Sequence, residues 1–375
     1  MSSLTARPLH QFELNTLSHV PDDYAWSALN DLPHGDDVVP VVDLASPDAV
    51  GHIGRACKEW GAFQVTGHGI PIHLLDRVEA QTRLLFSLPA ARKLKAARGP
   101  GSLSGYGLAN TSSFYSNIFW SEGFTIIGSP RDDARKLWPE DHDEYWYVHA
   151  CRLSNSCTRG RLITSRFSCS CVMEEYNRRI RDLSGRLLRA MMVSLGLHQD
   201  DMDWAGLLGE ADPVLQLNYY PVCPEPDRAI GIAHHTDSSF ITILHQSGGE
   251  SGLQLVHRED AAGPARWVTV PPRRGALVVN VGDLCEIVFN GRIRSVMHRA
   301  IVNRAQTRVS VAFFCGPPRR FNVAPIEKLI GPGEPPAYRA MSWPEFLSLK
   351  RKLYNKTLEY LRSPEEEAVH HENSA

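Results

Sequence analysis

Two histidines and an aspartate lie close together in an otherwise apolar stretch of this chain. In "AIGIAHHTDSSFITIL", residues 229–244, one residue separates His235 from Asp237. Because alternate side chains of a β-strand point to the same face, a strand here would present an imidazole and a carboxylate together. His234 would point to the opposite face, and we interpret it as a neighbour of the site. His298, in "SVMHRAIV", is the candidate third donor on a later strand.

This donor set indicates a divalent transition metal. Two histidines and one carboxylate hold ferrous iron on one face of an octahedron and leave three positions open. Zinc also accepts nitrogen and oxygen ligands, so metal-assisted hydrolysis is an alternative use of the same side chains. A third possibility is that each histidine only satisfies a buried hydrogen bond. The candidate ligands are His235, Asp237 and His298.

A second group of residues is suited to an acidic ligand. Arg308 and Ser310 share one face of the strand expected at "RVSVAFFCG". A buried guanidinium requires an anion, and its planar fork binds a carboxylate through two hydrogen bonds, to which a serine hydroxyl can add a third. Upstream, Asn218 and Tyr220 share a face of "LNYY", and the tyrosine hydroxyl can donate to the same carboxylate. Zinc-dependent hydrolysis would leave these residues without a ligand.

The elements that position these residues are predicted from hydrophobic periodicity. From Val214 onward, short β-rich runs divided by turn residues predict a barrel or jelly roll. Turn signals stand at Gly282-Asp283 and in "FNGR", just before the strand of His298. Apolar residues at helical spacing predict helices over 49–60, 72–88, 172–195 and around Trp343 to Tyr360. The expected strands are "AFQVTGHG", "VLQLNYY", "FITILHQ", "LQLV", "RWVTV", "ALVVNVG", "SVMHRAIV" and "RVSVAFF".

Composition excludes several classes of protein. The 375 residues are 43% hydrophobic and 22% charged with a formal net charge of -2, which argues against broad disorder and against a nucleic-acid partner. No stretch approaches the roughly 20 apolar residues that cross a bilayer, and the N-terminus has no apolar leader. We therefore expect a soluble, cytoplasmic protein without a membrane partner. The eight cysteines lack zinc-finger spacing, so most should be reduced thiols.

We divide the chain into four regions. Residues 1–37 form an N-terminal arm, 38–200 an N-terminal region of helices and strands, 201–325 the catalytic jelly-roll domain, and 326–375 a C-terminal helix and polar tail. Residues 147–171 are anomalous, since they hold four cysteines, four arginines and five serines but no Asp, Glu or Lys. A surface loop and a metal or redox cluster are two interpretations. We favour a third, a translated intron or other insertion foreign to the ancestral fold.

Taken together, these motifs resemble the plant family of iron(II)- and 2-oxoglutarate-dependent dioxygenases. The resemblance rests on "NYYPVCPEP", the His235 and Asp237 pair, His298 and "RVS", and extends to "VPVVDL" and "WGAFQVTGHGIP" in the N-terminal region. It implies an α+β fold with a double-stranded β-helix (jelly-roll) core and flanking α-helices.

The same resemblance implies the cofactors and the site. Fe(II) would be held by His235, Asp237 and His298. Arg308 and Ser310 would bind the distal carboxylate of 2-oxoglutarate. We count Arg308 among the catalytic residues. Asn218 and Tyr220 would be further cosubstrate contacts, and ascorbate the reductant. In such enzymes molecular oxygen and 2-oxoglutarate yield succinate and carbon dioxide while an unactivated carbon is hydroxylated.

The substrate class is suggested by narrower similarities. "SSFYSNIFWSEGFTIIGSP" and "AHHTDSS" resemble segments of gibberellin 3-oxidases. This resemblance implies 3β-hydroxylation of a nineteen-carbon gibberellin, a small molecule whose ring system would lie against Trp120 and Phe124. An ordinary buried strand is the alternative explanation of "WSEGFT". Gibberellin 2-oxidation, flavonoid oxidation, and a metal-retaining variant inactivated by residues 147–171 are the competing functions.

Overall fold

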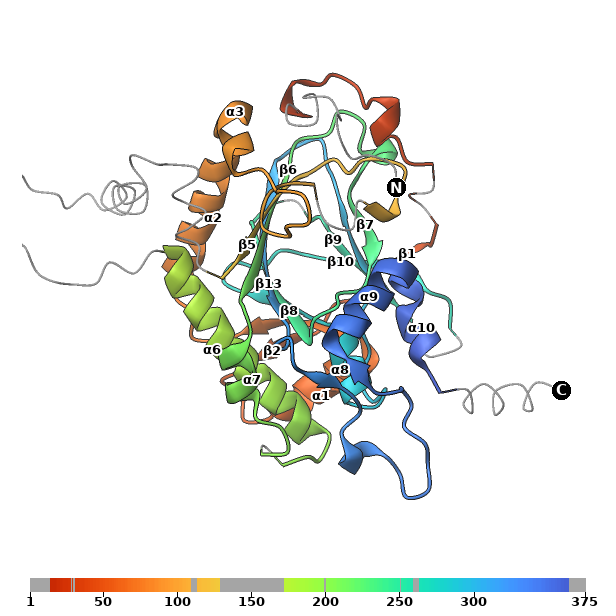
Figure 1. The fold of residues 1–375 in the computed structure, drawn as a ribbon. Coiled ribbons are helices and arrows are strands. Elements are labelled where there is room, and N and C mark those ends of the chain that lie inside the picture. The colour runs from red at the N-terminus through yellow and green to blue at the C-terminus, as the bar shows by residue number, and fades with distance from the viewer. Residues whose placement is uncertain are drawn as a thin grey trace, which may run out of the picture.

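Two β-sheets face each other at the centre of this computed structural model, and helices cover the outside of the larger sheet (Figure 1). The structure describes residues 14–27, 29, 31–108, 113–128, 172–198, 200–249, 251–258 and 263–363. The five-stranded sheet has the order β1 (His34–Gly35), β10 (Arg266–Val270), β9 (Leu253–His257), β12 (His298–Ile301) and β7 (Ile230–His235). The eight-stranded sheet has the order β2 (Val41–Asp43), β3 (Ala62–Thr66), β11 (Leu277–Val281), β8 (Ile241–Gln246), β13 (Arg308–Cys315), β6 (Val214–Tyr220), β5 (Glu122–Ile127) and β4 (Gly105–Gly107).

Alternation along the strands fills the space between the sheets. Leu244 of β8 and Val278 of β11, which are directly paired, come from the larger sheet. Leu255 of β9 and Val268 of β10 face them from the smaller sheet, in the same buried apolar cluster. Because a strand has a period of two, the intervening residues point outward, where helices or solvent meet them. Of the catalytic residues predicted from the sequence, His235 and His298 lie on strands of the smaller sheet and Arg308 lies on a strand of the larger sheet.

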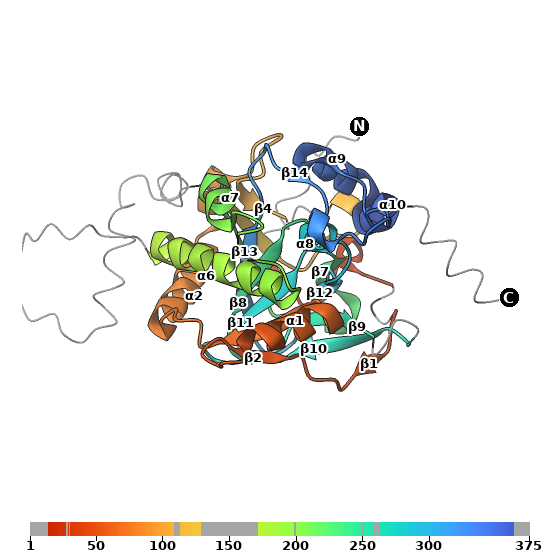
Figure 2. The same cartoon turned by 90° about the horizontal axis from the view of Figure 1, so that it is seen from below.

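Three long helices pack on the outer face of the eight-stranded sheet (Figures 1 and 2). These are α1 (Ala49–Glu59), α2 (Ile72–Phe86) and α6 (Val172–Ser194). In α6, Tyr176, Ile180, Leu183 and Leu187 recur every three or four residues and are fully or almost fully buried. This stripe packs against the sheet because its apolar surface would otherwise face water.

The shorter elements complete the chain. Asp203 begins α7 (Trp204–Glu210) by accepting a hydrogen bond from the Gly206 amide, and Ser342 begins α9 (Trp343–Leu353) in the same way. The remaining elements are α3 (Ala90–Lys93), α8 (Asp283–Val288), α10 (Thr357–Leu361), β14 (Asn322–Val323), β15 (Met341–Ser342) and the 3₁₀ turns η2 (Leu14–Thr16), η3 (Asp22–Tyr24), η4 (Leu94–Ala96), η6 (Pro226–Arg228), η7 (Glu327–Leu329) and η8 (Tyr354–Lys356). In both views α9 and α10 lie on the side of the molecule away from α2.

The fold class predicted from the sequence is confirmed, as are the helices over 49–60, 72–88 and 172–195 to within two residues. Two predictions were wrong in detail. Asp283 begins the short helix α8 rather than only a turn. The expected final helix is divided at Tyr354, whose φ of 51° breaks the helical path between α9 and α10.

Parts of the N-terminal arm lie against this body. Leu14, Val20 and Tyr24 are buried in one cluster with Trp120. The four cysteines within the described residues, Cys57, Cys223, Cys285 and Cys315, are buried free thiols, in agreement with the prediction. The anomalous segment 147–171 lies outside the described residues.

Candidate metal centre

The first two predicted ligands come from the connection between the two sheets. β7 carries His235 at its last position, and Asp237 follows in the turn toward β8. The expectation that both residues belong to one strand was therefore wrong, because the chain leaves the five-stranded sheet after His235. The turn is held in place by α8, whose Asp283 amide donates to the Asp237 carbonyl oxygen at 2.8 Å.

The third predicted ligand is brought to the other two by strand pairing. His298, the first residue of β12, lies directly opposite His235 in the antiparallel ladder, and their ring centroids are 4.2 Å apart. The Nε2 atom of His235 lies 3.6 Å from Asp237 Oδ1, and the Nε2 atom of His298 lies 3.7 Å from Asp237 Oδ2. One donor atom from each side chain lies within 4.8 Å of the others, and the described residues contain no second such group.

Hydrogen bonds orient both imidazoles for metal binding. The Nδ1 atom of His235 lies 2.9 Å from the Ala233 carbonyl oxygen, and that of His298 lies 3.1 Å from the Val296 carbonyl oxygen. A carbonyl only accepts, so Nδ1 carries the proton and Nε2 presents its lone pair. Both Nε2 atoms are thus free to face a common ion.

The electrostatics of the cluster also suit a cation. Asp237 is 5% exposed, and its Oδ2 has no hydrogen-bond partner among the described residues. A buried carboxylate oxygen without a partner is costly, and a bound cation would remove that cost. Burial first, and then the neighbouring His298, lowers the pKa of His235 to about 3, so this imidazole is neutral near pH 7. Neutral imidazole is the form that binds metals. The residues present therefore fit a divalent transition metal.

The second predicted cluster lies on the paired strands β6 and β13. Arg308 is directly opposite Tyr220, and Ser310 is opposite Asn218, whose side-chain amide donates to the Ser310 hydroxyl at 3.5 Å. The four side chains share one face, as their alternation predicted. The Arg308 guanidinium also lies over the Tyr220 ring, 5.0 Å from its centroid.

Arg308 is buried without an acidic partner among the described residues. Its Nη2 donates to Gln246 Oε1 at 3.0 Å, whereas Nε and Nη1 have no hydrogen-bond partner there. Burial is the largest influence on its pKa and lowers it. A guanidinium at 4% exposure without an acidic partner favours the binding of an anion, and its N–H groups can donate to a carboxylate.

Gln246 was missed in the sequence-based prediction. It is the last residue of β8 and is paired directly with Ser310. A polar residue at the end of the apolar run "FITILHQ" was the available signal.

Two glycines let the clusters approach each other. A side chain at Gly231 of β7 would meet the Tyr220 ring at 2.6 Å, and one at Gly252, just before β9, would meet Arg308 Cδ at 2.7 Å. The strand that carries His235, β7, and the chain that enters β9 therefore pack directly over the side chains of the arginine cluster.

The expected substrate aromatics do not offer an open surface. Phe124 of β5 pairs with Leu217, whereas its neighbour Gly123 pairs with Asn218, so Phe124 points away from the Asn218 face and into the helix-side core. Trp120 is fully buried, packs edge-on against Tyr24 at 5.6 Å and donates from its indole nitrogen to a backbone carbonyl. The prediction that these rings line the substrate site was wrong, because neither ring has surface left for a ligand.

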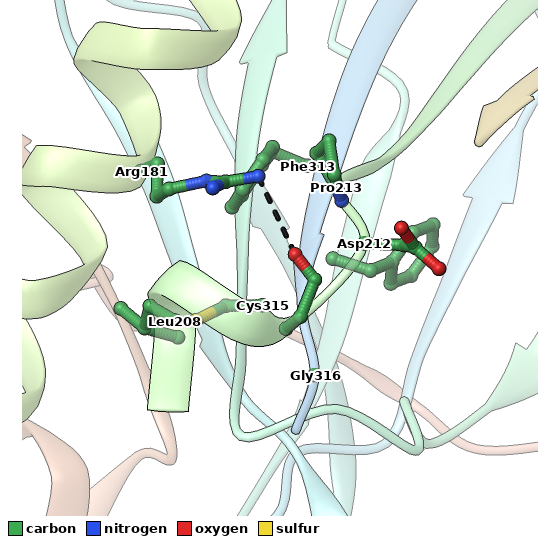
Figure 3. A pocket seen from close by; sticks show the side chains of 9 residues that line it. Arg181, Leu208, Asp212, Pro213, Phe313, Cys315 and Gly316 are labelled. Carbon is green, nitrogen blue, oxygen red and sulfur yellow. Dashed lines mark hydrogen bonds between the residues drawn. The ribbon is translucent and has the colours of Figure 1, made fainter. Parts of the chain in front are cut away.

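A separate pocket lies between α6, α7 and the end of β13 (Figure 3). Arg181 and Cys315 line it, and Arg181 donates to the Ala211 carbonyl oxygen at 3.4 Å. None of its lining residues belongs to the metal or arginine cluster.

None of the helices in the described part of the chain has the length and the apolar composition that a membrane span requires.

Comparisons with known proteins agree with this geometry. Residues 211–317 match the profile of the 2OG-Fe(II) oxygenase superfamily, and residues 39–147 match that of the non-haem dioxygenase in morphine synthesis N-terminal region. The chain is 43% identical over 369 residues to gibberellin 3-beta-dioxygenase 1 of Arabidopsis thaliana, covering 96% of this chain and 95% of that protein. It is also 43% identical over 373 residues to gibberellin 3-beta-dioxygenase 1 of Pisum sativum, covering 95% and 92%.

Solved structures give the same result for the fold. The crystal structure of JOX2 in complex with 2OG, Fe and JA has a TM-score of 0.75 at 30% identity and covers 93% of this chain and 95% of JOX2. A dioxygenase for auxin oxidation in rice has a TM-score of 0.64 at 25% identity, covering 87% of this chain and 100% of that protein. The similarity thus extends over most of the chain.

Proposed function

Because this chain belongs to the 2OG-Fe(II) oxygenase superfamily, we propose that it hydroxylates a gibberellin at carbon 3 in the β configuration. The observation that carries the substrate class is the 43% identity, over almost the full length of both chains, to two gibberellin 3-beta-dioxygenases. In this reaction a carbon-hydrogen bond, molecular oxygen and 2-oxoglutarate become a hydroxyl group, succinate and carbon dioxide. The product is a bioactive gibberellin.

The roles of the clustered residues follow from their geometry. His235, Asp237 and His298 hold Fe(II), since their donor atoms converge and both imidazoles present Nε2. When bound, the iron supplies the redox and dioxygen chemistry of the reaction. Because only three side chains supply donors, a bound ion would keep open positions for other ligands.

The arginine cluster positions the cosubstrate. Arg308 and Ser310 bind the distal carboxylate of 2-oxoglutarate, and Tyr220 and Asn218 complete that pocket. The support is the buried Arg308 guanidinium, which has no acidic partner among the described residues and two N–H donors without a partner there, so that an anion would compensate its charge. Ascorbate serves as the reductant that keeps the iron ferrous, and the enzyme acts in the cytoplasm.

A hydrolase on the same three ligands is the second class of function. It would leave a buried guanidinium with no ligand, at a cost of about 3–5 kcal/mol for an unpaired buried charge. The oxygenase uses both clusters and is therefore preferred. Gibberellin 2-oxidation and flavonoid oxidation remain alternatives within the family, and inactivation by residues 147–171 is an alternative for this chain.

The experiment that tests the proposal is a coupled product assay. Purified protein is incubated with Fe(II), ascorbate, 2-oxoglutarate and a panel of nineteen-carbon gibberellins, and mass spectrometry locates the new hydroxyl group while succinate is measured in parallel. We expect one succinate for each hydroxyl group at carbon 3. Hydroxylation at carbon 2, or turnover of flavonoids alone, would reject the substrate assignment. Absence of succinate with every substrate would favour the inactive variant.

A further inference from the structure

A buried lysine from the C-terminal helix reaches the metal-binding turn. Lys350 of α9 is 8% exposed, and its ammonium donates to the Thr236 hydroxyl and to Asp283 Oδ2, each at 2.6 Å. Thr236 is the residue between His235 and Asp237. The side chain therefore contacts the middle of the segment that supplies two of the three ligands.

The partner of this lysine connects to the other ligand segments. Asp283 is fully buried; its Oδ1 accepts from the Ser295 hydroxyl at 2.7 Å, and its amide donates to the Asp237 carbonyl oxygen at 2.8 Å. Ser295 lies three residues before His298. Lys350 and Asp283 together thus form hydrogen bonds with the chain segments that carry all three ligands.

A second set of contacts joins the same C-terminal region to β7. The Tyr354 hydroxyl and the Asn355 amide both donate to the His234 carbonyl oxygen, at 3.1 and 3.2 Å. Tyr354 has a φ of 51°, which is unfavourable for a residue other than glycine and persists only where the surroundings enforce it. The residue before the ligand His235 is therefore held by the C-terminal segment as well.

We propose that Lys350 is a positioning residue for the metal centre, and that residues 343–356 keep the three ligands in their converged arrangement. The inference rests on the iron site of the proposed function. Simple packing of α9 would be served by an apolar residue, since a buried ion pair gives little net stability over apolar residues of similar size. A cation at this position is explained by its two acceptors, which belong to the metal-binding turn and to α8.

The test measures Co(II) binding, without gibberellin or oxygen turnover. Co(II) is titrated into the full chain and followed by calorimetry and by its visible absorption spectrum, which reports the ligand geometry. The variants are Lys350→Met, Thr236→Val and the double variant of Lys350→Met with Asp283→Asn. Lys352→Met, at an exposed position of the same helix, is the matched control.

We expect Lys350→Met and Thr236→Val to raise the Co(II) dissociation constant by about 10-fold to 100-fold, as is typical when residues that orient metal ligands are removed. The double variant leaves no unpaired buried charge, so its melting temperature should recover relative to Lys350→Met while its Co(II) affinity stays weak. Lys352→Met should bind Co(II) as the wild type does.

The outcomes separate this inference from the proposed function. Wild-type Co(II) affinity and spectrum in Thr236→Val, or in the folded double variant, would overturn the positioning role. Thr236→Val keeps the lysine and aspartate together, so the test stands even where Lys350→Met does not fold. If the variants bind Co(II) weakly and the wild type yields no 3-hydroxylated gibberellin, the positioning role would be supported and the proposed substrate rejected.

Discussion

Replacement of Arg308 by methionine should weaken the binding of the cosubstrate without lowering the stability of the ligand-free protein. The wild-type guanidinium is buried, with two donors that lack partners among the described residues and one hydrogen bond to Gln246. We propose that the distal carboxylate of 2-oxoglutarate accepts two hydrogen bonds from this guanidinium. Arg308→Met removes them and leaves the carboxylate of the ligand without a charged partner.

The magnitude follows from those two hydrogen bonds. Hydrogen bonds to charged groups contribute about 1.5–3 kcal/mol each, so two of them contribute about 3–6 kcal/mol. At 1.4 kcal/mol for each factor of ten, the dissociation constant of 2-oxoglutarate should rise by about 10²-fold to 10⁴-fold. Without the ligand, Arg308→Met should be at least as stable as the wild type, because burial disfavours the charged guanidinium and the variant removes that charge.

The assay combines calorimetric titration of 2-oxoglutarate in the presence of Co(II) with thermal unfolding. At a ligand concentration of 100 times the dissociation constant, the wild type should gain about 2.7 kcal/mol of stability, and Arg308→Met should gain almost none at that same concentration. Arg304→Met, at an exposed position nearby, is the control and should behave as the wild type. A variant that keeps the wild-type affinity, or one that unfolds without ligand while Arg304→Met does not, would refute the reasoning.

Three further predictions concern the ligands, the anomalous segment and acid stability. Asp237→Ala should abolish Co(II) binding, measured by calorimetry, and succinate release, measured enzymatically; full turnover would contradict the ligand assignment. Deletion of residues 147–171 should leave a folded protein with equal or higher 3-hydroxylation, measured by circular dichroism and product formation, and an unfolded product would count against a foreign insertion. Burial lowers the pKa of His245 from its ordinary 6.5, so the folded state takes up fewer protons than the unfolded state as the pH falls below 6.5, and stability is lost. In urea titrations, the free energy of unfolding of His245→Leu should therefore exceed that of the wild type by more at pH 5 than at pH 8. An equal difference at both pH values would refute this cause.

Local patterns predicted the strands well because strand periodicity is a property of the chain itself. Arg308 with Ser310, and Asn218 with Tyr220, share faces for that reason, and the structure pairs them across one ladder. The separation of His235 and Asp237 by one residue likewise indicated a metal site. The strand interpretation failed at Asp237, because the crossing from one sheet to the other, absent from any local pattern, ends β7 at His235.

The direction in which Phe124 points, and contacts between distant segments, could not be predicted from such patterns. The segment around Phe124 was identified by resemblance, yet the register of β5 against β6 turns the ring into the helix-side core. Gln246 meets Arg308 across 62 positions of sequence, and no periodicity connects them. Burial of both side chains, which makes this contact important, is likewise decided by the packed sheets.

The sequence alone determined the donor types, the spacing of His235 and Asp237, the Arg308 and Ser310 pair, and the strands that carry them, because these depend on chemistry and on the geometry of neighbouring residues. Only the tertiary structure decided that His298 stands opposite His235 and that Lys350 reaches Thr236 from 114 positions away. Such contacts arise when distant segments pack to bury their apolar faces, and the polar groups trapped between them then find the partners that this packing provides.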